Sequence, residues 1–474
     1  MKRILHVSAE CTPFAKIGGL ADVVGALPNE IKRLGNADVR VIIPYYKSIP
    51  QEFKQKTSDV LDFKFDFDYE EQYVGIKSLK LGNILYYFID NEFYFGSRDN
   101  IYNYGDEINR FAYFQLAVLE SLKRLEFYPD IIHVHDWHTA MIPLLIKNKY
   151  RNIQSKTVLS IHNLAYQGVF PLQDYVHFNM EYDNRFEFEG NLNFLKAGII
   201  TADAVTTVSP NYASEILTDY YGYGMQQLLK QRGSDLIGIL NGVDYKEFSP
   251  EKDSFIARKY SIEDYKVGKK ANKIELYRSL KCDFPTEKPL ISIVSRLVNQ
   301  KGIDLIQRIG EEMLMHDDFF FVVLGSGEKN YEDYFYKLQD RFPDKVRVYL
   351  GYSNKLAHQI YAGSDMFLMP SKFEPCGLGQ IIALKYGTIP IVRETGGLVD
   401  TIQPYNEYDK DGNGFSFSNF NAHDMMHVIR YALHTYQNHP TDWEKLVKNA
   451  MKQDFSWKKS AIAYRNIYND IQNK

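Results

Sequence analysis

The feature that most constrains the fold of this chain is a repeated alternation of short apolar runs with longer helical patterns. Runs of four to six residues separated by amphipathic stretches are typical of βαβ units. The first series of runs covers 4–7, 39–43, 84–89, 131–135, 157–161 and 204–208, and the second covers 290–295, 319–324, 346–350, 366–369 and 389–392. The sequence therefore predicts an α/β protein with two doubly wound, Rossmann-like domains that face each other across a deep cleft.

A turn signal at Asn241-Gly242 separates the two series and is followed by a polar, lysine-rich stretch up to Lys288. We therefore predict an N-terminal domain at 1–243 and a C-terminal domain at 244–457. The last 17 or so residues have an apolar helical face, so we expect a helix at about 458–474 to pack back on the first domain. Alternating polar and apolar residues from Phe63 to Leu81 instead predict an antiparallel excursion.

Composition excludes several classes of partner. The chain has 474 residues, enough for two large domains, and its 56 basic and 60 acidic residues give a net charge of −4. This balance gives no reason to expect nucleic acid or an anionic membrane as a partner. No apolar run approaches the length of a membrane span, and no signal peptide is recognisable. The three cysteines are scattered and odd in number, which favours a reducing, cytoplasmic location.

Two glycine-bearing turns indicate where a ligand binds. Lys16-Ile17-Gly18-Gly19-Leu20 lies near the start of the first series, and Glu374-Pro375-Cys376-Gly377-Leu378-Gly379 lies in the second, each between a strand and a helix. Such turns leave backbone N–H groups free to bind an anion, commonly a phosphate. In the first turn we expect Gly18 and Gly19 to allow positive φ and close approach of a ligand. One turn in each half suggests that both domains close on one phosphorylated ligand.

Four motifs in register resemble the family of bacterial glycogen synthases and plant starch synthases. Besides the two glycine turns, they are His162-Asn163-Leu164-Ala165-Tyr166-Gln167-Gly168 and Ser295-Arg296-Leu297 followed by Gln300-Lys301-Gly302. The resemblance covers essentially the whole chain. It implies the GT-B arrangement of two Rossmann-like domains, with the acceptor on the N-terminal domain and the nucleotide sugar on the C-terminal one. It also implies transfer of glucose from ADP-glucose to the non-reducing end of an α-1,4-glucan such as glycogen, with retention of configuration.

The charged residues of these motifs suit departure of a nucleoside diphosphate. Arg296 and Lys301 follow a predicted strand, and their cationic groups would stabilise the charge that develops on the leaving phosphate. Lys16, with Gly18 and Gly19, is implied to bind ADP-glucose, and Asp22 to orient the sugar or acceptor. For Asp22 alone, a helix N-terminal charge that complements the helix dipole explains the residue equally well.

The remaining site residues follow from the same resemblance. His162 and Asn163 are placed beside the donor sugar, where His162 stabilises the oxocarbenium-like centre without acting as a general base. Glu374 would accept hydrogen bonds from glucose hydroxyls or face the developing positive carbon, while Cys376, Gly377 and Leu378 offer N–H groups. Related nucleotide-sugar transferases carry a second glutamate eight positions after the first, where this chain has Ile382. This departure weakens a UDP-sugar interpretation.

The expected contacts to the acceptor sugar and the base come from three aromatic residues and one aspartate. Asp136 and Trp137, at the end of the 131–135 strand, are expected to line the acceptor site. Tyr94 is a candidate stacking platform for an acceptor sugar, and Tyr352 is a candidate for stacking on adenine.

We expect no metal and no bound cofactor. Asp66-Phe67-Asp68 mimics a D-x-D metal motif but lies in the antiparallel segment. His133, His135, Asp136 and His138 resemble a transition-metal cluster, although alternation places His133 and His135 on one side of their strand.

The sequence thus predicts an ADP-glucose:α-1,4-glucan glucosyltransferase. Two alternatives stay open: a UDP-sugar-dependent retaining transferase with a small acceptor, and a non-catalytic protein that binds α-glucan or nucleotide sugar.

Overall fold

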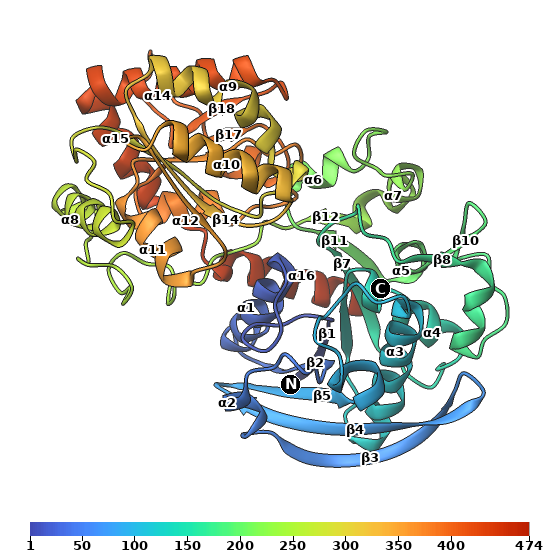
Figure 1. The fold of residues 1–474 in the computed structure, drawn as a ribbon. Helices are drawn as coiled ribbons and strands as arrows, with labels where there is room; N and C mark the ends of the chain where they lie inside the picture. Colours follow the sequence, from blue (N-terminus) through green and yellow to red (C-terminus); the bar gives the residue numbers. More distant parts are fainter. Residues whose placement is uncertain (474) are drawn as a thin grey trace. The chain divides into compact units, whose positions relative to one another are not determined.

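A computed structural model describes residues 1–473 of the protein and divides the chain into two compact units (Figure 1). The first, which we call the N-unit, comprises residues 1–242 together with the segment from Trp457 onward. The second, the C-unit, comprises residues 243–456. The predicted boundaries at 243/244 and 457/458 each lie one residue from those of the structure.

The N-unit contains a nine-stranded sheet in the order β12-β11-β7-β6-β1-β2-β5-β4-β3. The first seven strands of this order, from β12 through β5, pair in parallel. The last two, β4 and β3, are antiparallel to their neighbours. The strands are β1 (Lys2–Val7), β2 (Ala37–Pro44), β3 (Ser58–Phe67), β4 (Glu70–Leu81), β5 (Ile84–Asp90), β6 (Ile131–His135), β7 (Lys156–Ile161), β11 (Ala204–Thr207) and β12 (Leu236–Gly238).

The predicted antiparallel excursion is the β3-β4 hairpin, which begins earlier than the alternation suggested. Its residues are half-exposed because the hairpin extends the edge of the sheet, whereas β6 is buried throughout. A separate three-stranded sheet, which the sequence did not indicate, consists of β8 (Val169–Pro171), β10 (Asn191–Asn193) and β9 (Glu187–Phe188).

Helices connect the parallel strands of the N-unit (Figure 1). They include α1 (Gly19–Arg33), α3 (Glu107–Arg124), α4 (Ile142–Asn148), α5 (Phe194–Thr201), α6 (Pro210–Glu215) and α7 (Gln226–Arg232), besides the short α2 (Gln51–Lys54). The returning helix is α16 (Trp457–Asn473), which packs beside α1. The predicted apolar face of α16 is buried, at Ala461, Tyr464, Ile467 and Ile471.

The C-unit contains a six-stranded parallel sheet in the order β15-β14-β13-β16-β17-β18. Its strands are β13 (Leu290–Val294), β14 (Phe320–Gly325), β15 (Val346–Leu350), β16 (Met366–Met369), β17 (Ile389–Arg393) and β18 (Phe415–Phe417). Its helices are α8 (Tyr265–Ser279), α9 (Ile303–His316), α10 (Lys329–Arg341), α11 (Asn354–Gly363), α12 (Gly379–Lys385), α13 (Gly397–Thr401), α14 (Ala422–Asn438) and α15 (Pro440–Lys452).

Strand order fixes where ligands bind in such sheets. In the N-unit the order reverses between β1 and β6, and in the C-unit it reverses between β13 and β16. A crevice forms beyond the carboxyl ends of the strands at such a switch point. Each pair of strands is followed by predicted site residues. Among the described residues, no helix is both long and apolar enough to cross a membrane.

Candidate functional site

The first glycine turn is held by a carboxylate that the sequence analysis did not identify. Glu10, only 4% exposed, accepts hydrogen bonds from the backbone N–H groups of Ile17 (2.6 Å) and Gly18 (3.0 Å). Its other oxygen accepts from the Tyr102 hydroxyl at 2.7 Å. Two amides of the predicted anion-binding turn are therefore already paired with an acid of the chain itself.

The glycines of this turn do not have the expected backbone conformation. Gly18 precedes α1 with φ −145°, so positive φ was a wrong prediction for this residue, and Gly19 is not in the left-handed region either. A Cβ on either residue would meet nothing within 4 Å. Neither residue needs to be glycine for packing in the described chain, and the absence of side chains leaves open space above the start of α1.

Lys16 and Asp22, both predicted to contact substrate, pair with each other across this turn. The Lys16 ammonium lies 2.7 Å from Oδ1 of Asp22, in the first turn of α1. Burial raises the pKa of the Asp22 carboxyl, and the neighbouring Lys16 charge partly offsets this shift.

Asp136 follows β6 in a conformation that non-glycine residues rarely adopt, with φ 54° and ψ −174°. Its Oδ1 accepts a hydrogen bond from the His162 N–H at 2.7 Å, which joins the ends of β6 and β7. The side chain is buried, and this burial raises the pKa of Asp136 to about 7, although the N–H groups of His162 and Asn163 oppose the shift. Strain and a strongly shifted pKa at a strand end make Asp136 a candidate functional residue.

His162 lies at the end of β7, and its ring reaches back toward β6. His162 Nε2 is 3.1 Å from His135 Nδ1, and burial lowers the pKa of His162 to about 3. The imidazole is therefore neutral. Asn163 uses its Oδ1 to accept from the Ala165 N–H, which tightens the loop that follows.

Trp137 lies in a hollow of the N-unit. The hollow is lined by Glu107, Trp137, Ala165, Tyr166, Gln167, Gly168, Val169, Phe170 and Tyr223. Gly168 has φ +64°, and a Cβ there would lie 2.5 Å from the indole. The last glycine of the His162 to Gly168 motif is thus required by both its backbone conformation and Trp137. Exposed and half-buried aromatic rings with a few polar groups give this hollow the character of a sugar-binding surface.

Tyr94 does not have the exposure that its predicted role requires. It is 4% exposed, and its ring stacks on Tyr113 with centroids 4.6 Å apart. Its backbone N–H is bound by Asn91, and it packs into the aromatic core beside β3 and α3. The prediction of an exposed stacking platform at Tyr94 was therefore wrong. Sequence alone could not tell which of two neighbouring aromatic residues is buried. In the structure Phe93 is 65% exposed, whereas Tyr94 lies in the core.

In the C-unit, the neighbouring strands β13 and β16 bring together Lys301 and Glu374. The Lys301 ammonium is 2.6 Å from Glu374 Oε2, which also accepts from the Ser371 hydroxyl at 3.0 Å. The side chains of Lys301 and Glu374 are only 17% and 9% exposed, respectively. This buried ion pair was not foreseen, because the two residues are far apart in sequence.

Glycines shape the backbone around this pair. Gly302 has φ +70°, and a Cβ there would lie 2.0 Å from the carbonyl oxygen of Pro370. Gly377 has φ +72° in the second glycine turn, between the buried Cys376 and Leu378, which is the residue before α12. Close approach and left-handed conformation therefore account for two glycines of the quoted motifs.

Arg296 and Tyr352 present exposed side chains. Arg296 follows β13, and its guanidinium makes no hydrogen bond or ion pair within residues 1–473. Tyr352 is 79% exposed after β15, and its hydroxyl lies 3.4 Å from Asn354 Oδ1. Both side chains are accessible to a ligand, as their predicted roles require.

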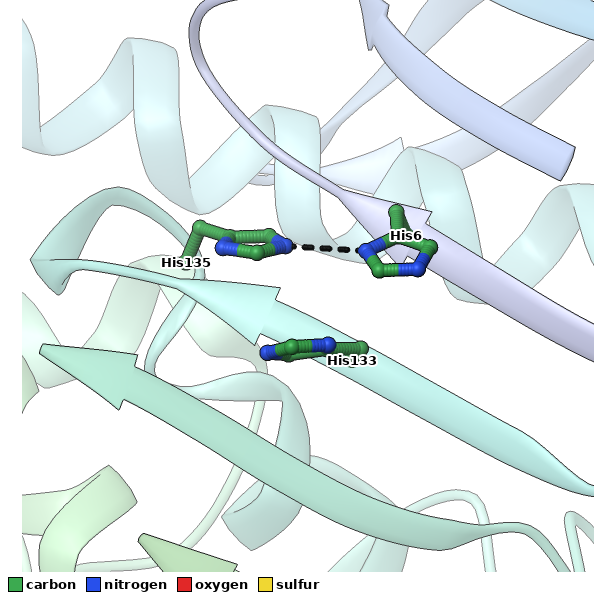
Figure 2. A group of neighbouring side chains, drawn as sticks. All are labelled: His6, His133 and His135. Carbon is green, nitrogen blue, oxygen red and sulfur yellow. Dashed lines mark hydrogen bonds between the residues drawn. The ribbon is translucent and has the colours of Figure 1, made fainter. Parts of the chain in front are cut away.

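The residues considered for metal binding are engaged otherwise. Asp68 pairs with His177 at 3.0 Å, and His138 stacks on Trp137 with centroids 3.9 Å apart. His133 and His135 do lie on one side of β6, as predicted, with their rings stacked (Figure 2). Among the described residues, they form a group of neighbouring ligand atoms with His6 of β1, and not with Asp136 or His138.

Comparisons with known proteins match the whole chain. Residues 3–231 match the starch synthase catalytic domain, and residues 280–453 match glycosyl transferases group 1. Glycogen synthases from Geobacillus thermodenitrificans and Bacillus subtilis are 47% and 48% identical, covering at least 99% of this chain and 98% of each relative. The chain belongs to the glycogen and starch synthase family.

A solved structure extends the likeness to the fold. The catalytic domain of starch synthase IV from Arabidopsis thaliana, bound to ADP and acarbose, is similar over the full length of both chains, with a TM-score of 0.93 and 32% identity. Sucrose-phosphate synthase from Thermosynechococcus elongatus shares the fold at 14% identity, with a TM-score of 0.63. The family member described here is therefore a glycosyltransferase with the GT-B fold.

Proposed function

We propose that this chain is a glycogen synthase that transfers glucose from ADP-glucose to the non-reducing end of an α-1,4-glucan, with retention of configuration. The observation that carries the proposal is the identity of 47% with glycogen synthases over the full length of both chains. The ADP bound to the similar Arabidopsis starch synthase supports an adenine nucleotide as the leaving group.

The chemistry asks the C-unit to stabilise the departing diphosphate. Transfer breaks the bond between the glucose C1 and the phosphate oxygen, forms a bond from C1 to an acceptor hydroxyl oxygen, and releases ADP and the hydroxyl proton. Arg296 offers an exposed planar fork of N–H donors to the phosphates, and Lys301 adds a point charge. Glu374, held by Lys301 and Ser371, is fixed in position to accept from a sugar hydroxyl. Cys376, Gly377 and Leu378 are assigned to the same ligand.

The N-unit is assigned to the sugar and the acceptor. Gly18 and Gly19 leave open space at the start of α1, and Lys16 and Asp22 pair with each other across the same turn. Asp136 lies at the switch point of the sheet, and His162, after the next strand β7, donates its backbone N–H to it. We assign the glucan chain to the aromatic hollow around Trp137. Asn163 shapes its rim, and Tyr352 of the C-unit is assigned to adenine.

We further propose that the reaction needs no metal or bound cofactor, because Arg296 and Lys301 supply the positive charge that a metal would otherwise bring to the phosphates. Transfer is expected to survive dialysis against EDTA, and rescue of a lost activity by added Mg²⁺ would contradict this. The free cysteines Cys11, Cys282 and Cys376 support a cytoplasmic location.

Nucleotide release with several donors tests the proposal directly. ADP-glucose and UDP-glucose are compared with and without glycogen, and product chains are digested to confirm α-1,4 linkage. We expect glycogen-dependent release of ADP. Preferential release of UDP to a small acceptor would instead support a UDP-sugar transferase, and binding without release would support a non-catalytic protein.

A further inference from the structure

Packing does little to hold the first glycine turn in one conformation. A Cβ on Gly18 or Gly19 would meet nothing within 4 Å in the described chain, and Ile17 is 54% exposed. Glycine also loses more conformational freedom on folding than any other residue. A turn of this composition therefore needs a restraint from another part of the chain.

Glu10 supplies that restraint from the end of the central strand β1. One oxygen of its carboxylate, Oε2, accepts from two successive backbone amides, those of Ile17 at 2.6 Å and Gly18 at 3.0 Å. Ser8 in turn fixes the backbone of Glu10, because its hydroxyl donates to the Glu10 carbonyl at 2.8 Å. Peptide groups are planar and rigid, so a charged acceptor shared by two of them sets the orientation of both.

Tyr102, in the loop before α3, holds the other oxygen of the same carboxylate. Its hydroxyl donates to Glu10 Oε1 at 2.7 Å. Burial and the neighbouring Glu10 charge raise the pKa of the Tyr102 phenol well above its ordinary value, so the hydroxyl keeps its proton and acts as the donor. With both oxygens engaged, the Glu10 carboxylate cannot rotate without losing a hydrogen bond.

The ring of Tyr102 continues toward the aromatic hollow. It stacks on His138 with centroids 4.9 Å apart and planes 25° apart, and His138 stacks on Trp137 with centroids 3.9 Å apart. Trp137 lines the hollow to which we assign the glucan. The hydroxyl of Tyr102 thus supports the first glycine turn, whereas its ring supports Trp137.

We propose that Glu10 and Tyr102 are positioning residues, Glu10 for the first glycine turn and Tyr102 for both Glu10 and Trp137. The contacts of the turn with ADP-glucose and of Trp137 with glucan rest on the proposed function. The restraint on the turn does not, because it follows from contacts within the N-unit alone.

Removal of one hydroxyl tests the link from Tyr102 to the donor. Tyr102→Phe keeps the ring stack but releases Glu10 Oε1, so the KM for ADP-glucose should rise about threefold with the KM for glycogen unchanged. Tyr104→Phe is the matched control, because it removes a hydroxyl from the same loop that binds the Asn100 N–H instead of Glu10. Both KM values should stay at the wild-type level in Tyr104→Phe.

Substitutions of Glu10 test the restraint without reference to activity. Glu10→Ala leaves the Ile17 and Gly18 amides without their acceptor, whereas Glu10→Gln keeps one oxygen for both amides. Hydrogen–deuterium exchange, measured by mass spectrometry on peptides covering residues 11–20, should be faster in Glu10→Ala and close to wild type in Glu10→Gln. The KM for ADP-glucose should rise about tenfold in Glu10→Ala and much less in Glu10→Gln.

Two further variants separate the roles of Tyr102. Tyr102→Leu removes the ring as well as the hydroxyl, so the KM for glycogen should rise too, because His138 and Trp137 lose their support. In the double variant of Glu10→Ala with Tyr102→Phe, the KM for ADP-glucose should not exceed that of Glu10→Ala, since the hydroxyl acts through Glu10. A loss of folded protein would instead lower kcat and leave both KM values unchanged.

Unchanged exchange of residues 11–20 in Glu10→Ala would overturn the restraint. Equal KM values for ADP-glucose in Tyr102→Phe and Tyr104→Phe, or additive effects in the double variant, would overturn the role of Tyr102. If Glu10→Ala does not fold, exchange and KM in Tyr102→Phe against Tyr104→Phe still decide the matter. Failure of the proposed function looks different, because the wild type itself would release no ADP while exchange still distinguished the variants.

Discussion

Arg296 and Lys301 come from the same short segment, yet their surroundings give them different tasks. Lys301 is buried against Glu374, so its charge is tied to the stability of the C-unit. Arg296 is exposed and makes no ion pair in the described chain, so folding gains little from it. A free cation at a switch point is available entirely for a ligand.

The first prediction concerns Arg296. Arg296→Ala should lower kcat/KM for ADP-glucose by about 100-fold, because one preorganised donor to the leaving phosphate is lost. Arg296→Lys should recover only part of this, since an ammonium lacks the planar fork of donors. The free energy of unfolding should change by less than about 0.5 kcal/mol. Steady-state ADP release measures kcat/KM, and urea unfolding measures the free energy of unfolding. A large loss of stability would contradict the assignment of Arg296 to the ligand.

The second prediction concerns the Lys301–Glu374 pair. Lys301→Met leaves the Glu374 carboxylate buried without its cation, which should cost about 3 kcal/mol of unfolding free energy. Glu374→Gln added to Lys301→Met removes the unpaired charge and should recover most of that stability. Neither variant should recover glucosyl transfer, because both lack the cation.

Urea unfolding and ADP release, measured on the same preparations, separate the two effects. Activity that returned together with stability in the double variant would show that Lys301 acts only through folding.

The third prediction follows from the pKa of Asp136, which burial raises to about 7. Between the pKa of the unfolded chain, about 4, and this value, the folded protein keeps a proton that the unfolded chain has lost. The contribution of Asp136 to stability is therefore greatest at low pH and is lost as pH rises through 7. Asp136→Asn removes this dependence, so its melting temperature relative to the wild type should rise from about pH 5 to pH 8. A constant difference across this range would contradict the shifted pKa.

At the scale of elements, the periodicity of the chain was enough to predict both parallel sheets. The predicted runs 131–135 and 366–369 coincide with β6 and β16, whose burial favours apolar side chains. The run 346–350 coincides with β15, a partly buried strand at the edge of the sheet. Motif positions then placed the candidate residues after β1, β6, β7, β13 and β16. Recognition of the family supplied their roles, which spacing alone could not.

Contacts between elements were beyond the reach of the sequence. Glu10 caps the first glycine turn from within a loop that has no periodicity, so nothing local marked it. The hydrogen bonds of His135 to His6 and His162 connect β6 with β1 and with the turn after β7, whereas alternation indicated only that His133 and His135 share a side. Tyr94 was misplaced because a tyrosine suits a core as well as a sugar site.

The fourth prediction concerns α16, whose Tyr468 hydroxyl bonds His133 Nδ1 in the buried face of the sheet. Tyr468→Phe keeps the ring but leaves that nitrogen without a partner, so it should cost about 1–2 kcal/mol of unfolding free energy. Tyr468→Ala should cost about 4 kcal/mol, since it also opens a cavity. Urea unfolding checks both values. Equal losses in the two variants would show that the hydrogen bond, rather than packing, holds α16.

At the scale of the whole molecule, the two units differ in their buried titratable groups. Burial lowers the pKa of five N-unit histidines far below the ordinary value of 6.5, namely His6, His133, His135, His138 and His162. In the C-unit, burial lowers the pKa of Lys269 to about 7. Lys269 therefore affects stability between about pH 7 and pH 10, whereas the histidines act below pH 6.5.

The last prediction is that acid destabilises the N-unit first. Below pH 6.5 the unfolded histidines take up protons that the folded ones refuse, so the stability they contribute is present above pH 6.5 and lost as pH falls. The raised pKa values of Asp136 and Asp22 act in the opposite direction, because the folded protein keeps protons there that the unfolded chain has lost. Only two carboxyl groups do this, against five histidines. The net loss of unfolding free energy should reach about 4 kcal/mol per pH unit near pH 5.

Tryptophan fluorescence can follow each unit separately. In Trp443→Phe, the remaining Trp137 and Trp457 report on the N-unit. When Trp137 and Trp457 are replaced by Phe instead, Trp443 reports on the C-unit. Fluorescence melts between pH 8 and pH 5 should show the N-unit signal shifting to lower temperature well before the C-unit signal, and parallel shifts of both signals would refute the assignment.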